Sequence, residues 1–189
     1  SMQRLADAYR DSLETLIEYC ADPAHGSLTP SDFPLAGVDA PELKRLLQNH
    51  PDPEDIYPAT PLQQGMIFHS QLTEVPTAAA YITQVVWTLD GPLDAGALER
   101  AWQTAAARHE TLRTGFADTI TGRPLAIVHR AVQLHLELTD WRALPEEAQH
   151  RALEAALAAD REQGFEISAA PLMRLRLFRC TADRHQLVW

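Results

Sequence analysis

The stretch that decides the fold runs from Tyr81 to Phe116 and reads "YITQVVWTLDGPLDAGALERAWQTAAARHETLRTGF". Residues 81–89 are rich in β-branched and aromatic side chains, which is typical of a strand, and the turn "DGP" ends this run. Apolar residues then recur at helical spacing over residues 94–108. A strand followed directly by a helix predicts a mixed α/β fold, in which helices pack on a sheet.

Downstream of this unit the pattern continues with further strands and one long helix. "TLRTGF", "RPLAIVH" and "VQLHLEL" are short strand candidates separated by turns, which predicts a hairpin or meander. "LPEEAQHRALEAALAADREQGF" predicts a helix, with Pro145 near its start and Gly164 at its end. "LMRLRLFRC" then alternates between apolar and polar residues, and "HQLVW" predicts the beginning of another strand.

Upstream lies "DIYPATPLQQGMIFHSQL", residues 55–72, where a proline-marked turn leads into a helix pattern. Thr60 can cap this helix, and Gln63 stands where a capping-box partner reaches back. The apolar residues of the helix cover more than one face. We therefore expect a mostly buried helix, with Leu62, Met66 and Leu72 in the core.

The N-terminal quarter alternates between helix patterns and turn-rich stretches. An apolar stripe predicts a helix over residues 4–20. "GSLTPSDFPLAGVDAPEL" is rich in proline and small polar residues, so we interpret it as a linker, and a short helix is predicted over 41–48. "NHPDPEDIYP" is expected to break the chain again.

Composition excludes several classes of protein. A net charge of −10 and a single lysine, Lys44, make a nucleic-acid surface improbable, because such surfaces need clustered basic residues. The longest apolar runs are too short to span a membrane. Cys20 and Cys180 lie far apart and fit no metal or redox spacing, so we expect a reducing, cytoplasmic environment. Because the sequence begins within a helix pattern, we expect an excised fragment.

The usual catalytic motifs find no support. Gly91 and Gly96 have phosphate-loop spacing, but the Lys and Ser or Thr of that motif are missing and nearby carboxylates would repel phosphate. No serine lies in a GxSxG elbow, which argues against a serine hydrolase. His129 and His135 have no ligands at metal spacing, so no metal site is predicted.

"RHETLRTGF", residues 108–116, brings two arginines, a histidine and a glutamate into one helix–strand junction. A structural ion pair of Arg108 or Arg113 with Glu110 is the simplest interpretation. A buried arginine would need a further carboxylate from elsewhere in the fold. The sequence leaves both possibilities open.

These segments together resemble one protein family. "DIYPATPLQQGMIFHSQL" resembles the first motif of nonribosomal peptide synthetase condensation domains, in the variant that accepts a D-configured donor. "RHETLRTGF" resembles the second motif, and "GFEISAAPLMRLRLFRCTADRHQLVW" resembles the approach to the third, catalytic motif. "LETLIEYC" and "TPSDFPLAGV" are similar to the tail of an epimerization domain and its linker, a region that also resembles fused docking segments of synthetases.

The resemblance implies a chloramphenicol-acetyltransferase-like fold of two lobes, with a tunnel that the phosphopantetheine arms of donor and acceptor carrier domains enter from opposite faces. The arms are substrates, and no directly bound cofactor is implied. The acceptor amine attacks the donor thioester and forms a peptide bond. The family's His-His-x-x-x-Asp-Gly motif, whose second histidine is its base or amine-positioning group, is expected just after Trp189. We therefore expect the N-terminal lobe only, without activity of its own.

The resemblance also divides the chain into parts and assigns residues to roles. It implies an upstream-domain helix over 1–24, a docking-like linker over 25–54 and the lobe over 55–189. Expected partners are carrier domains, the upstream epimerization domain, the missing C-terminal lobe and a second copy. The alternatives are a docking module or an epimerization-domain fragment. The implied residues are the motif residues Arg108, His109, Glu110 and Arg113, one arginine of which pairs with the catalytic-motif aspartate, and the tunnel candidates Gln63, Gln64, Gly65 and Phe68.

Overall fold

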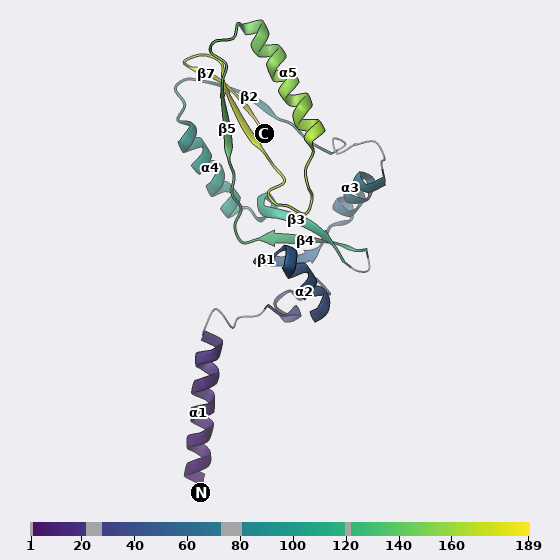
Figure 1. Ribbon diagram of the computed structural model, residues 1–189, viewed down its shortest axis with the longest axis vertical. Coiled ribbons are helices and arrows are strands. Elements are labelled where there is room, and N and C mark those ends of the chain that lie inside the picture. The colour runs from purple at the N-terminus through teal and green to yellow at the C-terminus, as the bar shows by residue number, and fades with distance from the viewer. Residues whose placement is uncertain (1, 22–27, 73–80, 120–121) are drawn as a thin grey trace.

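The computed structural model describes residues 2–21, 28–72, 81–119 and 122–189 (Figure 1). Its helices are α1 (Met2–Ala21), α2 (Ala40–Asn49), α3 (Pro61–Leu72), α4 (Ala95–Arg108) and α5 (Glu146–Gln163), with the short 3-10 turns η2 (Pro30–Asp32) and η4 (Glu110–Arg113). Its strands are β1 (Pro53–Pro58), β2 (Val86–Asp90), β3 (Thr114–Asp118), β4 (Pro124–His129), β5 (Leu136–Asp140), β6 (Leu175–Arg179) and β7 (Arg184–Val188).

The strands form two sheets, with the orders β1-β4-β3 and β2-β7-β6-β5. The predicted hairpin is confirmed, because β3 and β4 pair antiparallel. Its extension into a meander is wrong, since β5 leaves that sheet and pairs parallel with β6 in the other. A parallel pair needs a crossover connection, and α5 supplies it between the two strands.

Helices α4 and α5 cover opposite faces of the four-stranded sheet, along which they run in Figure 1. Ala106 of α4 packs with Leu175 of β6, whereas Leu153 of α5 packs with Phe178 of the same strand. Residues an odd number of positions apart on a strand point to opposite faces. The helix-on-sheet architecture predicted from the sequence is therefore confirmed.

The local signals at the helix ends are also confirmed. The Thr60 amide donates to Gln63 Oε1 over 2.8 Å, and the Gln63 amide donates to Thr60 Oγ1 over 3.4 Å, which closes the capping box at α3. Asp94 Oδ1 accepts from the Ala97 amide at the start of α4. Gly164 has a φ of 63° and ends α5. Each of these signals depends only on neighbouring residues.

The three-stranded sheet packs against residues 28–50, which we call the covering segment. It contributes side chains to a core that also holds Ile56 of β1 and Leu125 and Ile127 of β4. Arg123 adds a hydrogen bond of 2.5 Å to the Ala36 carbonyl oxygen. The contributed side chains are Phe33, Ala36, Val38, Leu43 and Leu46. The stretch interpreted as a linker thus contributes buried side chains to this core, although Leu35 within it is exposed.

Strand β1 corrects the expectation that "NHPDPEDIYP" only breaks the chain. Residues 53–58 of this stretch pair antiparallel with β4, and β1 is an edge strand of its sheet. Proline is tolerated on an edge strand and at a strand end, where its missing N–H is not needed. Pro53 and Pro58 stand at the two ends of β1.

Helix α3 corrects a second expectation, since it is mostly exposed. Leu62 is 70% exposed and Met66 is also exposed, while Ile67 is buried. The side chain of Leu72 lies outside the described residues. The wide apolar pattern predicts burial, but α3 packs only one of its described side chains into the interior.

Helix α1 is confirmed as a helix, and its apolar stripe faces solvent at Leu5, Tyr9, Leu13, Leu16 and Ile17. The predicted strand over 81–89 begins later than expected, at Val86. Val85 and Trp189 nevertheless exchange two backbone hydrogen bonds, which extend the β2–β7 ladder by one pair. Within the described ranges, no helix is long and apolar enough to cross a membrane.

Candidate functional site

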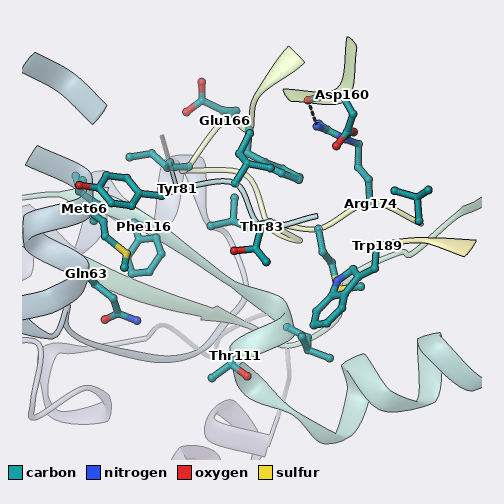
Figure 2. A pocket seen from close by; sticks show the side chains of 18 of the residues that line it. Gln63, Met66, Tyr81, Thr83, Thr111, Phe116, Asp160, Glu166, Arg174 and Trp189 are labelled. Atoms are coloured by element: carbon teal, nitrogen blue, oxygen red, sulfur yellow. Dashed lines mark hydrogen bonds and ion pairs between the residues drawn. The ribbon is translucent and has the colours of Figure 1, made fainter. Parts of the chain in front are cut away.

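A cavity of about 640 Å³ lies where α3, the junction around η4, the end of α5 and the last strand meet (Figure 2). Each region contributes lining side chains from a different part of the sequence, so the fold and not one motif creates the cavity. Representative lining residues are Gln63 and Met66 of α3, Tyr81 and Thr83, Thr111 and Phe116, Asp160 and Glu166, and Arg174 and Trp189.

One wall of the cavity is a closed network around Asp160 and Arg174. Arg174 Nε donates to Asp160 Oδ1 over 2.8 Å, and Arg174 Nη1 donates to the Gly164 carbonyl oxygen over 2.6 Å. Its guanidinium also lies 4.0 Å from the centre of the Phe165 ring, within the range of a cation–π contact. Figure 2 shows the Asp160–Arg174 pair facing the same space as Trp189. The arginine therefore fixes the end of α5 against β6.

The charge of Asp160 is well supported despite its burial. Burial acts to raise the pKa of Asp160, but hydrogen bonds from Gln84 and Arg174 and the charges of Arg174 and Arg176 outweigh it. The net result is a pKa below the ordinary value. Gln84 Nε2 lies 2.9 Å from Asp160 Oδ2, so the same carboxylate also ties residues 81–85 to α5.

Beside this charged wall the cavity has an aromatic edge. Trp189 stacks on Trp87, with ring centres 6.0 Å apart and planes 9° apart, and its ring centre lies 5.5 Å from that of Trp102. Val188 and Trp189 both line the cavity, so the end of β7 forms part of its edge. An aromatic surface beside a charged wall can hold a ligand that is apolar at one end and polar at the other.

The tunnel candidates on α3 fall in different places. Gln63 lines the cavity together with Met66 and Ile67. Gln64 donates from Nε2 to the Ala59 carbonyl oxygen over 2.6 Å, which gives it a role in holding the helix start. Phe68 is 57% exposed, and neither it nor Gly65 is among the residues that line this cavity.

The motif "RHETLRTGF" has one buried arginine. Arg113 is 5% exposed, and its Nη1 donates to Glu54 Oε2 and, over 2.6 Å, to the His129 carbonyl oxygen. Arg108 and His109 are exposed at the end of α4, and Glu110 accepts from Thr114 Oγ1 through its backbone oxygen. The expected ion pair of Arg113 with Glu110 is thus wrong, because the carboxylate that Arg113 contacts is that of Glu54 in β1. The further carboxylate that a buried arginine needs is present.

Several residues of the cavity were not singled out by the sequence reasoning. Arg174 and Arg176 alternate with buried leucines in "LMRLRLFRC", and this alternation places both arginines on one face of β6. Their partner Asp160 lies on α5, and sequence spacing gives no hint of that contact. In the ranges that the structure describes, no group of three or more His, Cys, Asp or Glu residues could hold a metal ion.

Comparisons with known proteins agree on one family. The family model described as "Condensation domain" matches residues 53–189. A component of the linear gramicidin synthase of Brevibacillus parabrevis is 39% identical over 189 residues, which are 100% of this chain and 2% of that protein. Bacitracin synthase 1 of Bacillus licheniformis is 30% identical over 191 aligned residues, 100% of this chain and 4% of that protein.

Solved structures agree with this result. The first condensation domain of the calcium-dependent antibiotic synthetase, in complex with a substrate analogue, is 26% identical, with a TM-score of 0.61 over 68% of this chain and 30% of that one. The condensation domain of a Monacolin K polyketide synthase has a TM-score of 0.61 at 20% identity, over 72% of this chain and 30% of that one, which is a likeness of fold. The chain thus spans a small part of the proteins it matches.

Proposed function

The chain belongs to the condensation-domain family of nonribosomal peptide synthetases, and from this premise we propose that it is part of a domain that makes peptide bonds. Its fold is the chloramphenicol-acetyltransferase-like fold of its structural neighbours. The observation that carries the proposal is the family match over residues 53–189, which includes the motif that places the buried Arg113.

The proposed reaction joins two carrier-bound substrates. The amine of the acceptor aminoacyl group attacks the carbonyl carbon of the donor peptidyl thioester, so a C–N bond forms and the C–S bond breaks. The donor carrier keeps its phosphopantetheine arm as a free thiol, and the amine loses one proton. The phosphopantetheine arms are substrates of this reaction, and no further cofactor is proposed.

The cavity supports this proposal as one wall of the space in which the substrates meet. Its aromatic edge at Trp189 and its charged wall at Arg174 suit an aminoacyl chain with apolar and polar parts. In this role Gln63 contacts substrate, while Gln64, Gly65 and Phe68 act through the position of α3. Arg113 fixes the junction behind the cavity.

The direct test uses a complete condensation domain that contains these residues, with donor and acceptor carrier domains loaded with their thioesters. Mass spectrometry of the acceptor carrier should show the elongated peptide. A loaded donor that stays intact in the presence of a loaded acceptor would reject the proposal. Substitution Trp189→Ala should lower product formation, whereas Arg151→Ala at an exposed position of α5 serves as the control.

We also propose that the 189 residues form no peptide bond by themselves. The sequence contains no two adjacent histidines, so the His-His-x-x-x-Asp-Gly motif of the family is not within it. A general base must lie within hydrogen-bond reach of the proton that it removes. Elongated acceptor carrier in an assay with this chain alone would contradict the inference.

A preference for a D-configured donor is the finer part of the proposal. It rests on the amino-acid sequence of residues 55–72 and on the likeness of residues 13–38 to an epimerization-domain tail and linker. The complete domain should therefore elongate a donor that ends in a D-residue faster than its L-epimer. Equal rates for the two epimers would remove this part and leave peptide-bond formation standing.

A second candidate function is docking between neighbouring synthetase domains. The observation that favours it is the exposed apolar stripe of α1, which includes Leu5, Tyr9, Leu13, Leu16 and Ile17. The proposed partner is the upstream epimerization domain, and self-association is the competing outcome. Light scattering of the chain with and without that domain distinguishes binding of the domain from self-association. A chain that stays monomeric and does not bind the domain would reject both outcomes.

We place the protein in the cytoplasm, where carrier domains are loaded.

A further inference from the structure

Two histidines, one buried and one half-buried, meet where the covering segment contacts the three-stranded sheet. His50 ends helix α2 as its C-cap, and His129 ends strand β4. Their ring centres lie 5.4 Å apart, with the planes at 65° to each other. His50 is 5% exposed, so the contact is a buried one between the covering segment and the three-stranded sheet.

Unsatisfied polar atoms gather at this contact. His50 Nδ1, His129 Nε2 and Arg113 Nε are buried and have no hydrogen-bond partner among the described residues. Native proteins pair the large majority of buried polar atoms, so three unpaired atoms in one cluster need a functional or structural explanation. Neutral imidazoles tolerate this environment, whereas a charged imidazole would need a partner.

Burial makes protonation of the pair costly, and charged groups of both signs lie around it. Arg113 of η4 bonds to the His129 carbonyl oxygen, so one cation already lies beside the pair, and its countercharge Glu54 of β1 is engaged with Arg113. On its other side His50 lines a cavity with Arg45 of α2, Asp118 of β3 and Glu166. Arg45 donates to the Asp118 carbonyl oxygen over 2.7 Å. Burial lowers the pKa of both histidines, and His129 adds to the effect on His50.

We propose that the His50–His129 contact is a proton-sensitive latch that strengthens the docking of the covering segment on the three-stranded sheet at neutral pH and weakens it as the pH falls. Each imidazole takes up a proton more readily in the released state than in the docked state, so protons favour release. Docking is therefore complete above the ordinary histidine pKa of 6.5 and weakens progressively below it.

The size of the effect is bounded by the same linkage. Between pH 7.5 and 5.5 each histidine can raise the equilibrium constant for release by at most about tenfold, and the two together by at most about 100-fold. The helix α2 dipole opposes this effect at His50, because a helix C-terminus favours a cation. We expect a rise of about tenfold or more for the pair.

The test is amide hydrogen exchange of the 189-residue chain, corrected for intrinsic exchange rates, from pH 7.5 to 5.5. Amides of α2 should lose about tenfold or more in protection, while amides of α5 and β6 should keep theirs. The double variant His50→Asn, His129→Gln keeps neutral polar groups near the two nitrogens but does not titrate. In this variant the protection of the α2 amides against hydrogen exchange should not change with pH. His135→Gln, at an exposed histidine, should behave like the wild type.

Two results would overturn the latch. One is an equal loss of protection in the wild type and the double variant, and the other is simultaneous loss in α2, α5 and β6, which would indicate global unfolding. If the double variant does not fold, an NMR titration of the two imidazoles in the wild type decides the question. Both histidines should then titrate below 6.5, and titration at or above that value would reject the proposal.

Discussion

The three-stranded sheet and the cavity region differ in how the chain covers them. At the first, the covering segment closes a core in which Ile56, Leu125 and Ile127 are fully buried. At the second, α3 leaves Leu62, Met66 and Phe68 exposed, and the interior space is lined by aliphatic and aromatic side chains together with charged groups. The closed region is stabilised by the burial of apolar side chains. In the cavity region fewer apolar side chains are buried, and the space between the elements stays accessible. Substitutions in the two regions should therefore differ in their effect on unfolding.

The largest effect is expected from Ile127→Ala in the closed core. Loss of a fully buried side chain leaves a cavity, so the free energy of unfolding should fall by about 4 kcal/mol. Phe68→Ala on the exposed face of α3 should change it by less than about 0.5 kcal/mol. Urea denaturation of the two variants measures both values. Equal losses would erase the distinction between the regions.

Arg113→Met tests the junction that connects the two regions. It removes a buried cation and leaves Glu54 without its partner, which should cost about 3 kcal/mol, at the low end for a buried pair because Glu54 is partly exposed. Arg108→Met at the end of α4 is the matched control and should cost less than about 0.5 kcal/mol. An unchanged free energy of unfolding in the Arg113→Met variant would show that the contact with Glu54 does not stabilise the fold.

Asp160→Asn tests the charged wall of the cavity. It keeps the shape of the side chain but weakens the bond to Arg174, so we expect a loss of about 2 kcal/mol at pH 7. Because the pKa of Asp160 is lowered in the folded protein, its stabilising contribution is present above 3.8 and is lost as the pH falls further. The difference between wild type and variant should shrink below pH 3.8, and a constant difference would contradict this assignment.

The smallest effect is expected at the start of α3. Thr60→Ala removes one half of the capping box and should cost about 1 kcal/mol. Thr60→Ser keeps the hydroxyl and should cost much less. Thermal denaturation of both variants compares them. A cost that is the same for Ala and Ser would mean that the hydroxyl does not cap α3.

The sequence predicted those features that depend on neighbouring residues. The helices α4 and α5 and the capping box at Thr60 follow from periodicity and from residues within one helical turn. The predicted burial of α3 is wrong, because an apolar pattern does not reveal whether another element packs against it. The contact between Arg113 and Glu54 spans 59 positions, and that between Gln84 and Asp160 spans 76, so local spacing could not indicate either. Strand β1 was missed because its end prolines resemble a loop.

The packed covering segment also sets a rule for exchanging modules between synthetases. A recombination junction placed at the start of the family match, residue 53, would separate Phe33, Val38 and Leu46 from the side chains they bury. The synthetase that supplies the upstream part of the hybrid would then have to provide three apolar side chains that fit the same core. A junction upstream of Leu28 keeps these contacts within one parent, and hybrids built there should fold more often than hybrids joined at residue 53.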